Sequence, residues 1–337
     1  MALKSPQKST NDRSIQFTTT HVAFRICEAL APRVGARVAE RLWFRLPPAR
    51  HSIATPSGAT PIRELLGSAF EVGLRGRSVR GWVWGEGPVV YLVHGWGGSL
   101  EQLTPLVAPL LDRGLQVVAF DGLGHGRSDA GVHGSGSSDA VELGRSLDAV
   151  AARFGSARAV VAHSMGALSA LLAIRDGWVA AERLVLIAPP SGIPDLLVRL
   201  QGELGLGVRT TRRLVERVRL RTGYAPDELD LVTIATSLER PERPELLVVH
   251  DLLDREVPHA PSARLVQSWP GAELFSTAGL GHRRVLADTA VGGAVARFVD
   301  RLPVEASLHG DDRPQPWPDA VADGRSATGG QARAGAA

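Results

Sequence analysis

The stretch VVAHSMGAL, Val160 to Leu168, decides which fold the chain is expected to have. A short apolar run leads into Ser164, and small and apolar residues follow it, as when a buried strand turns directly into a helix. The stretch departs from the pattern Gly-x-Ser-x-Gly at Ala162, but a sharp turn needs a small residue there more than it needs a glycine. Alone, the stretch leaves two interpretations open: a nucleophilic serine, or a serine that caps a helix.

Strand-like and helix-like segments alternate on both sides of this stretch. The strand-like runs are SAFEVGL, SVRGWVW, VVYLVHG, LQVVAFDG, ARAVVAHS, RLVLIAPP, ELLVVHD and AELFSTAG. Most are continuously apolar, which is typical of strands buried on both faces of a parallel sheet, whereas the first two alternate and are joined by a hairpin-like Arg75-Gly76-Arg77. Segments of helical length lie at 99–113, 138–154, 166–177 and 259–269. The chain is therefore predicted to be an α/β protein with a doubly wound sheet.

Composition divides the chain into three zones. Residues 1–60 are basic, with nine Lys and Arg against three Asp and Glu, and residues 61–302 hold the alternating segments. Residues 303–337 are rich in Pro, Gly, Ala and Asp and are predicted to be disordered. Inside the middle zone, about 190–244 is too long for an ordinary loop and contains helix-like stretches, so we expect a helical lid there.

The basic zone contains an amphipathic segment at residues 20–46. Its large aliphatic residues recur every four positions, which places them on one helical face: Ile26, Leu30, Val34, Val38 and Leu42. Pro32 starts or kinks this helix, and Pro47-Pro48 ends it. One interpretation is a helix docked on the main domain. The other is a peripheral helix on an anionic membrane, with Trp43 and Phe44 at the boundary.

Other features exclude several classes of protein. The net charge is only +3, and no zinc spacing, aromatic-basic pattern or recognition helix predicts a nucleic-acid partner. The single cysteine, Cys27, rules out a disulfide within the chain. The N-terminal residues lack the apolar stretch of a secretory signal, and no run of eighteen apolar residues occurs, so we expect a cytoplasmic protein.

Chemically versatile residues follow five of the predicted strands. The carboxyl ends of parallel strands meet at one edge of a sheet, which is where such folds bind ligands. The residues at these ends are His94-Gly95-Trp96-Gly97-Gly98, Asp121 to Ser128, Ser164, the pair Asp251 and Asp254, and Gly281-His282. We therefore expect one site at this edge.

The types of these residues match nucleophilic catalysis. A serine hydroxyl needs a base to take its proton and an acid to orient that base. His282 is the candidate base and Asp254 the favoured acid, with Asp251, which is closer to its strand end, as the rival. The backbone N–H groups of Met165, at the start of a helix, and Trp96, in the glycine-rich loop, are candidate oxyanion donors.

Five motifs together carry a resemblance to a known family. HGWGG, FDGLGHGRSD, AHSMGAL, HDLLDREVP and GLGHRRVL, in this order over residues 68–300, resemble the α/β-hydrolase superfamily in its ester-hydrolase-like branch. The resemblance implies an eight-stranded, mostly parallel sheet whose second strand is antiparallel, and a lid after the sixth strand. It also implies that Ser164 is the nucleophile, Asp254 the acid and His282 the base, with no cofactor and no metal.

The expected function is hydrolysis of carboxylic esters or thioesters through an acyl-enzyme. Two alternatives stay open: an acyltransferase that uses the same triad, and a non-catalytic protein that binds a small molecule or partner in this fold. Gly95 and Gly166 are expected to support the site by their small size. His94 is expected to support it by hydrogen bonds to the backbone, whereas His163 should face away from Ser164 because strand side chains alternate.

Two clusters in the predicted lid have more than one interpretation. The first is arginine-rich: Arg209, Arg212, Arg213, Arg217, Arg219 and Arg221. One interpretation is a solvated helix face, and the other is a positively charged entrance to the site that attracts an acidic group. The second is a leucine row, Leu196, Leu197, Leu200 and Leu204, which either packs on the core or covers an acyl pocket.

Overall fold

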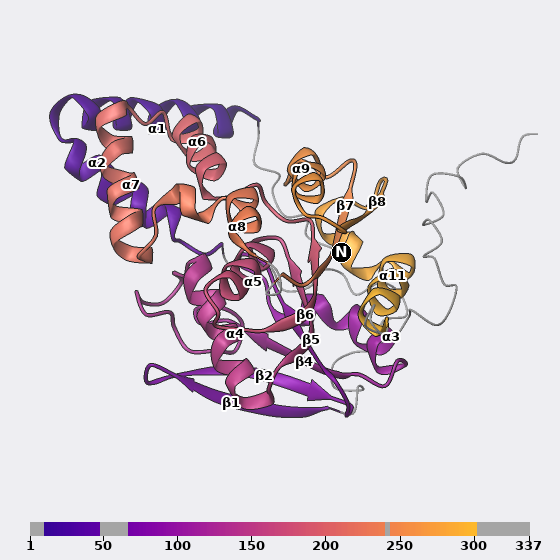
Figure 1. Ribbon diagram of the computed structural model, residues 1–337. Helices are drawn as coiled ribbons and strands as arrows, with labels where there is room; N and C mark the ends of the chain where they lie inside the picture. The colour runs from indigo at the N-terminus through magenta and orange to yellow at the C-terminus, as the bar shows by residue number, and fades with distance from the viewer. Residues whose placement is uncertain (1–9, 48–66, 240–242, 302–337) are drawn as a thin grey trace, which may run out of the picture.

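The computed structural model describes residues 10–47, 67–239 and 243–301, and side chains from residue 19 onward. Its centre is one eight-stranded sheet in the order β1-β2-β4-β3-β5-β6-β7-β8 (Figure 1). The strands are β1 (Ser68–Leu74), β2 (Arg77–Trp84), β3 (Val89–Val93), β4 (Gln116–Asp121), β5 (Ala157–His163), β6 (Ala181–Ile187), β7 (Glu245–Asp251) and β8 (Glu273–Thr277). The predicted tail at 303–337 lies outside the described residues.

The strand pairing matches the arrangement expected from the motifs. β2 runs antiparallel to both of its neighbours, β1 and β4, and all the other pairs are parallel. Arg75 and Gly76, both with positive φ, connect β1 to β2, so the hairpin prediction is confirmed. Each of the eight predicted runs forms a strand.

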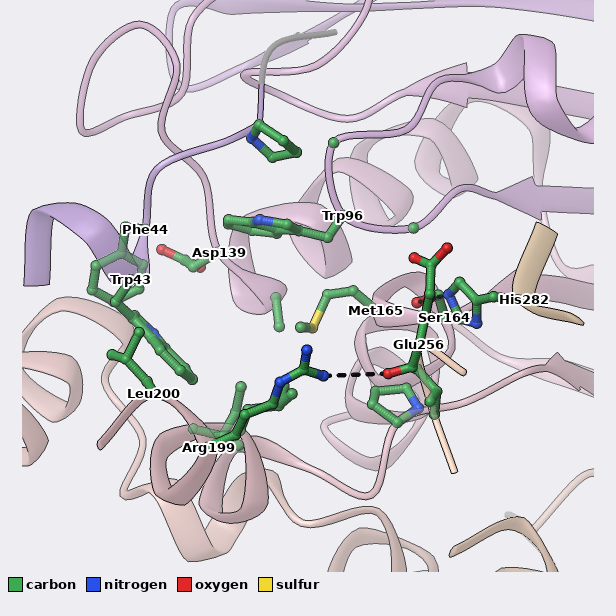
Figure 2. A pocket seen from close by; sticks show the side chains of 18 of the residues that line it. Trp43, Phe44, Trp96, Asp139, Ser164, Met165, Arg199, Leu200, Glu256 and His282 are labelled. Atoms are coloured by element: carbon green, nitrogen blue, oxygen red, sulfur yellow. Dashed lines mark hydrogen bonds between the residues drawn. The ribbon is translucent and has the colours of Figure 1, made fainter. Parts of the chain in front are cut away.

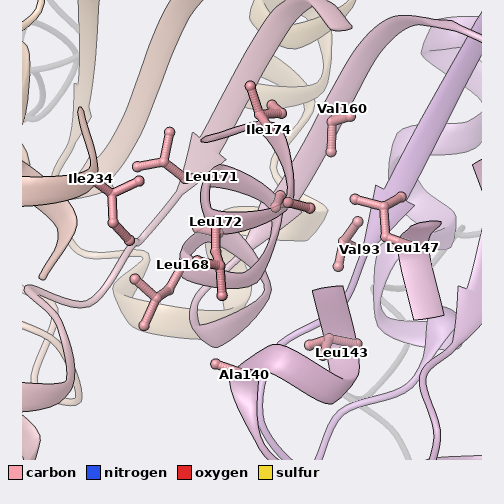
Figure 3. Close-up of a cluster of buried hydrophobic side chains, with 14 of the residues drawn as sticks. Val93, Ala140, Leu143, Leu147, Val160, Leu168, Leu171, Leu172, Ile174 and Ile234 are labelled. Atoms are coloured by element: carbon pink, nitrogen blue, oxygen red, sulfur yellow. The ribbon is translucent and has the colours of Figure 1, made fainter. Parts of the chain in front are cut away.

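Helices cover both faces of the sheet. One face packs against α4 (Ala140–Phe154), α5 (Met165–Arg175) and α9 (Ala260–Ser268), and the other against the turn of 3₁₀ helix η1 (Leu100–Leu106), α3 (Val107–Leu111) and α11 (Thr289–Asp300). Strand β3 is buried on both faces because Tyr91 points into the first layer and Leu92 into the second. Figure 3 shows the first layer, where leucines of α4 and α5 meet valines of the sheet. Such close packing fixes the strand ends that carry the candidate site.

The connection between β6 and β7 forms the expected lid. It consists of α6 (Ile193–Leu204), α7 (Val208–Thr222), η2 (Pro226–Leu229) and α8 (Leu231–Ser237). After the site loops come the short α10 (Gly281–Arg284) and η3 (Val285–Ala287). The fold is therefore the α/β class with a mostly parallel sheet, helices on both faces and a helical lid, as predicted.

The N-terminal segment packs on this lid as a helical hairpin, α1 (Thr10–Leu30) and α2 (Pro32–Trp43) (Figure 1). The two helices are separated at Ala31, directly before Pro32, so the proline starts a new helix. Together the hairpin and the lid helices α6 and α7 form what we call the cap. Among the described residues, no helix combines the length and apolarity needed to span a bilayer.

The hairpin docks through residues other than the predicted apolar face. The buried positions of α2 are Pro32, Gly35, Ala36 and Ala39, which lie on the side that faces α7. A Cβ on Gly35 would come within 3.2 Å of Thr210 Cγ2, so the two helices approach closely only because these residues are small. The large aliphatic residues remain on the outside.

Candidate active site

Ser164 lies at a strained turn between β5 and α5. Its φ of 53° and ψ of −124° belong to a region that non-glycine residues rarely adopt, and its N–H donates to Ile187 O (2.9 Å). The turn is tight enough that a Cβ on Gly166 would lie 2.3 Å from His94 O. A Cβ on Gly95 would lie 2.9 Å from Ser164 Cβ. Both glycines therefore allow backbone to approach the serine.

Ser164, His282 and Asp254 form one hydrogen-bonded series. The Ser164 hydroxyl donates to His282 Nε2 (2.9 Å), and His282 Nδ1–H donates to Asp254 Oδ2 (2.8 Å). Ser164 and Asp254, the two ends of this series, are separated by 90 positions in the sequence. They meet because each follows a parallel strand at the same edge of the sheet. The Asp254 side chain is fully buried, and its other oxygen accepts the N–H groups of Glu256 (2.8 Å) and Val257 (2.9 Å). Asp254 is thereby fixed with one oxygen aimed at the imidazole.

Asp251, the rival acid, is used differently. Its carboxylate accepts hydrogen bonds from Thr277 Oγ1 (2.8 Å) and from the backbone N–H groups of Leu253 (2.9 Å) and Leu280 (2.8 Å). Burial alone would raise the pKa of Asp251, but these hydrogen bonds outweigh it and lower the pKa. Asp251 ties the loop after β8 to the end of β7, and so supports the loop on which His282 lies.

The glycine-rich loop after β3 brings a second backbone segment to the serine. Gly98 N–H donates to Gly95 O (3.0 Å), which closes a tight turn with Gly97 at a φ of 63°. Trp96 therefore lies within this turn. Met165 is the first residue of α5, where backbone N–H groups have no intrahelical acceptor. Both amides thus belong to segments that border Ser164.

His94 holds this loop to its neighbour. Its Nδ1–H donates to Gly95 O (2.8 Å), and its Nε2 accepts the N–H of Gly122 (3.0 Å). Burial lowers the pKa of His94 to about 4, so the ring stays neutral and can keep both hydrogen bonds near neutral pH. His94 therefore supports the site through the backbone.

His163 does not face away from the site, contrary to the prediction. Its ring centroid lies 4.7 Å from that of His282, and its Nε2–H donates to His282 O (2.9 Å). The alternation of strand side chains ends at Ser164, whose turned backbone lets consecutive residues approach the same pocket. Burial and the neighbouring His282 lower the pKa of His163 to about 3. Its Nδ1 has no hydrogen-bond partner among the described residues.

A cavity of about 500 Å³ opens beside Ser164. Figure 2 shows Ser164 and His282 on one side of it, and Trp43, Phe44 and Leu200 on the other. Most of the lining is apolar, and it includes Trp43, Phe44, Trp96, Met165, Pro190, Ile193, Leu196, Leu200, Val218, Leu229 and Val257. Of the leucine row, Leu196 and Leu200 line the cavity, whereas Leu197 is buried in the core. The cavity can hold a sizeable apolar group next to the serine.

The N-terminal hairpin supplies one wall of this cavity. Trp43 and Phe44 therefore do not stand at an outer boundary, as the membrane interpretation expected. Phe44 is held by Arg221, whose guanidinium lies 3.6 Å from the ring centroid, and by its own carbonyl, which accepts Ser138 N–H (3.2 Å). Sequence reasoning missed this wall. The aromatic pair at the end of an amphipathic helix was its only signal.

The arginine cluster of the lid is also more than a solvated face. The N–H groups of Arg209 and Thr210, at the start of α7, donate to the two carboxylate oxygens of Glu28, each at 2.9 Å. Arg217 pairs with Glu40 of α2. These contacts bind the hairpin to the lid and provide α7 with an N-terminal cap.

Each carboxylate that lines the cavity is paired with an arginine. Three carboxylates line it, and each has an arginine partner: Asp139 with Arg221 (3.5 Å), Glu203 with Arg199 (2.8 Å) and Glu256 with Arg283 (2.9 Å). Arg255 also lines the cavity. Within the described ranges, no group of three or more His, Cys, Asp or Glu side chains is arranged to hold a metal ion.

Comparison with known proteins finds one family model that matches part of the chain. Residues 87–233, which include Ser164 but neither Asp254 nor His282, match the family described as serine aminopeptidase S33. No curated protein sequence matches the chain.

Solved structures share the fold at low sequence identity. An esterase from Pyrococcus furiosus is 18% identical, with a TM-score of 0.54 over 76% of this chain and 96% of that one. Est1E from Butyrivibrio proteoclasticus, solved with ferulic acid bound, is 17% identical, with a TM-score of 0.52 over 68% and 96%. A thioesterase domain from the curacin biosynthetic pathway is 17% identical, with a TM-score of 0.51 over 69% and 99%. The sheet order, the lid and these neighbours show that the chain has the α/β-hydrolase fold.

Proposed function

We propose that the protein is a serine hydrolase that cleaves carboxylic esters or thioesters through an acyl-enzyme. The observation that carries this proposal is the hydrogen-bonded series from Ser164 Oγ through His282 to Asp254 Oδ2. Asp254 accepts from Nδ1 and so leaves the Nε2 lone pair directed at the serine hydroxyl, which is the tautomer a general base needs.

In the proposed reaction, Ser164 Oγ attacks the carbonyl carbon while its proton passes to His282 Nε2. The backbone N–H groups of Met165 and Trp96 are the proposed donors to the developing oxyanion. His282 then gives its proton to the leaving alkoxide or thiolate, and the acyl-serine remains. Water, activated by His282, attacks the acyl carbon and releases the acid and the free serine.

The cavity favours a substrate with an apolar body and no positive charge. Its lining is mostly aromatic and aliphatic, which suits an acyl chain or an aromatic acid. The matched family description names an aminopeptidase, an enzyme that must accept a positively charged amino terminus. Every carboxylate in the described lining is already paired with an arginine, so we favour esters over aminoacyl amides.

The decisive experiment compares Ser164→Ala with the wild type on p-nitrophenyl esters of increasing acyl length. We expect Ser164→Ala to lose at least about a thousandfold in kcat. It should also lose labelling by a fluorophosphonate probe, while its melting temperature stays near that of the wild type. Ser268→Ala, on the distant α9, is the matched control and should retain both. Full activity in Ser164→Ala, or faster turnover of aminoacyl p-nitroanilides than of esters, would contradict the proposal.

A further inference from the structure

We propose that the outer face of the α1–α2 hairpin docks the protein on an anionic lipid surface. We define this outer face by six large aliphatic residues that recur every four positions across both helices: Val22, Ile26, Leu30, Val34, Val38 and Leu42. Their exposed fractions lie between 40% and 81%. Six such residues in one series are far more than the scattered apolar side chains that a protein surface normally carries.

This exposure does not come from a loosely held hairpin. The opposite side of the same helices is buried, with Phe24 5% exposed and Ala36 and Ala39 fully covered. That side packs against α6 and α7 of the lid, and Glu28 and Glu40 add hydrogen bonds and an ion pair to α7. The hairpin is therefore fixed to the lid by its small residues and lies at the edge of the molecule (Figure 1), while its large aliphatic residues stay exposed.

The charges beside the outer face are all positive. Arg33, Arg37 and Arg41 form a second row on α2, each one position before an aliphatic residue, with Arg25 and Arg45 at the flanks. All five are exposed, and none pairs with a carboxylate of the described residues. The acids of residues 19–47 are Glu28 and Glu40, and both point to the lid. An aliphatic ridge beside arginines is the arrangement of a helix that lies in the headgroup layer of anionic lipids.

The same charges disfavour a second copy of the chain as the occupant. A twofold contact through this face would bring two arginine rows together with no carboxylate between them. The hairpin presents a convex helical surface, which enters a soft headgroup layer without needing a complementary groove. Leu42, on the outer face, directly precedes Trp43 of the cavity wall, so the docked surface and the proposed acyl cavity share one helix.

The test uses the full chain and vesicle co-sedimentation. One set of vesicles is pure phosphatidylcholine, and the other contains one-third phosphatidylglycerol. We expect the wild type to bind the anionic vesicles and not the neutral ones. The variant L30S/V34S/V38S replaces three of the six aliphatic residues of the outer face and keeps every charge. The variant R33Q/R37Q/R41Q removes the arginine row of α2 and keeps all six aliphatic residues. Each should weaken binding to anionic vesicles by about tenfold or more.

Two controls make the result specific to this face. R113Q/R153Q/R264Q removes the same charge from the turn after α3, from α4 and from α9, and V132S/L220S removes exposed apolar residues outside the hairpin. Both should bind within about twofold of the wild type. Melting temperatures check that each variant folds.

Four results would overturn the proposal. The first is no binding of the wild type to anionic vesicles, and the second is unchanged binding by either hairpin variant. The third is an equal loss in the arginine control. The fourth is a wild-type dimer in analytical ultracentrifugation that L30S/V34S/V38S dissociates, which would assign the face to a second copy. Ester hydrolysis is measured separately, so failure of docking leaves the proposed function untouched.

Discussion

The carboxyl edge of the sheet and the cap above it both line the same cavity, but different kinds of contact hold them. At the sheet edge, backbone atoms do most of the positioning: Asp254 and Asp251 accept main-chain N–H groups, and Gly166 lets helix and strand meet. In the cap, charged side chains join segments that are distant in sequence, as between Glu28 and α7. We therefore expect changes at the sheet edge to be severe and changes in the cap to be graded.

The sharpest test of the edge compares its two carboxylates. Asp254→Asn should lower kcat by about four orders of magnitude, because an amide no longer holds the base in the required tautomer. Asp251→Asn should instead lower the free energy of unfolding by about 1–3 kcal/mol, because the NH2 group of the amide replaces one of the two oxygens that accept hydrogen bonds from buried donors. Ester kinetics and urea denaturation of both variants measure the difference. A larger loss of kcat in Asp251→Asn would reverse the assignment.

Two helical glycines test the contrast directly, one at the edge and one in the cap. Gly166→Ala should destabilise the protein by about 3 kcal/mol, since its Cβ would meet main-chain oxygen that cannot move aside. Gly202→Ala, in α6, has nothing within 4 Å of the new Cβ and should stabilise it by about 0.5–1 kcal/mol. Chemical denaturation gives both values. Equal effects would mean that the edge is not sterically constrained.

The smallest expected effect concerns the join between hairpin and lid. Glu28→Ala removes the acceptor for two N–H groups of α7 and should cost about 1 kcal/mol of unfolding free energy. Because the hairpin forms a cavity wall, KM for long-chain esters should rise more than kcat falls. Glu216→Ala, which removes an exposed acid of α7 itself, is the control and should change neither the unfolding free energy nor KM. A change in kcat with no change in KM would contradict this prediction, because it would mean that the substitution disturbs the catalytic residues and not the cavity wall.

Much of the sheet could be predicted because its signals are local. Strands buried on both faces are continuously apolar, as in Val89–Val93, and strand-end glycines mark the loops that approach one another. Asp254 was favoured over Asp251 from sequence, and the contacts of the two side chains differ accordingly. The hydrogen bond between Ser164 and His282 follows once both are placed at the same sheet edge.

The cap could not be predicted in the same way because its contacts are long-range. The aromatic pair Trp43 and Phe44 stands out at the end of an amphipathic helix, but the sequence does not show that it faces a cavity whose other walls come from the lid. The amphipathic pattern of α2 identifies an apolar face correctly, but it does not say that small residues on another side make the tighter contact. His163 was misplaced because strand alternation stops at the strained backbone of Ser164.

Glu28 also ties the completion of the cap to the order in which the chain is synthesised. It is 181 residues from Arg209, so the ribosome releases the hairpin long before α7 exists to be capped. During that interval the small-residue side of α2 has no partner, and the aliphatic series on its other side is exposed as well. Helices α1 and α2 are thus synthesised before α7, but their packing is completed only with it. The small-residue side of the hairpin therefore stays uncovered until the lid has been synthesised.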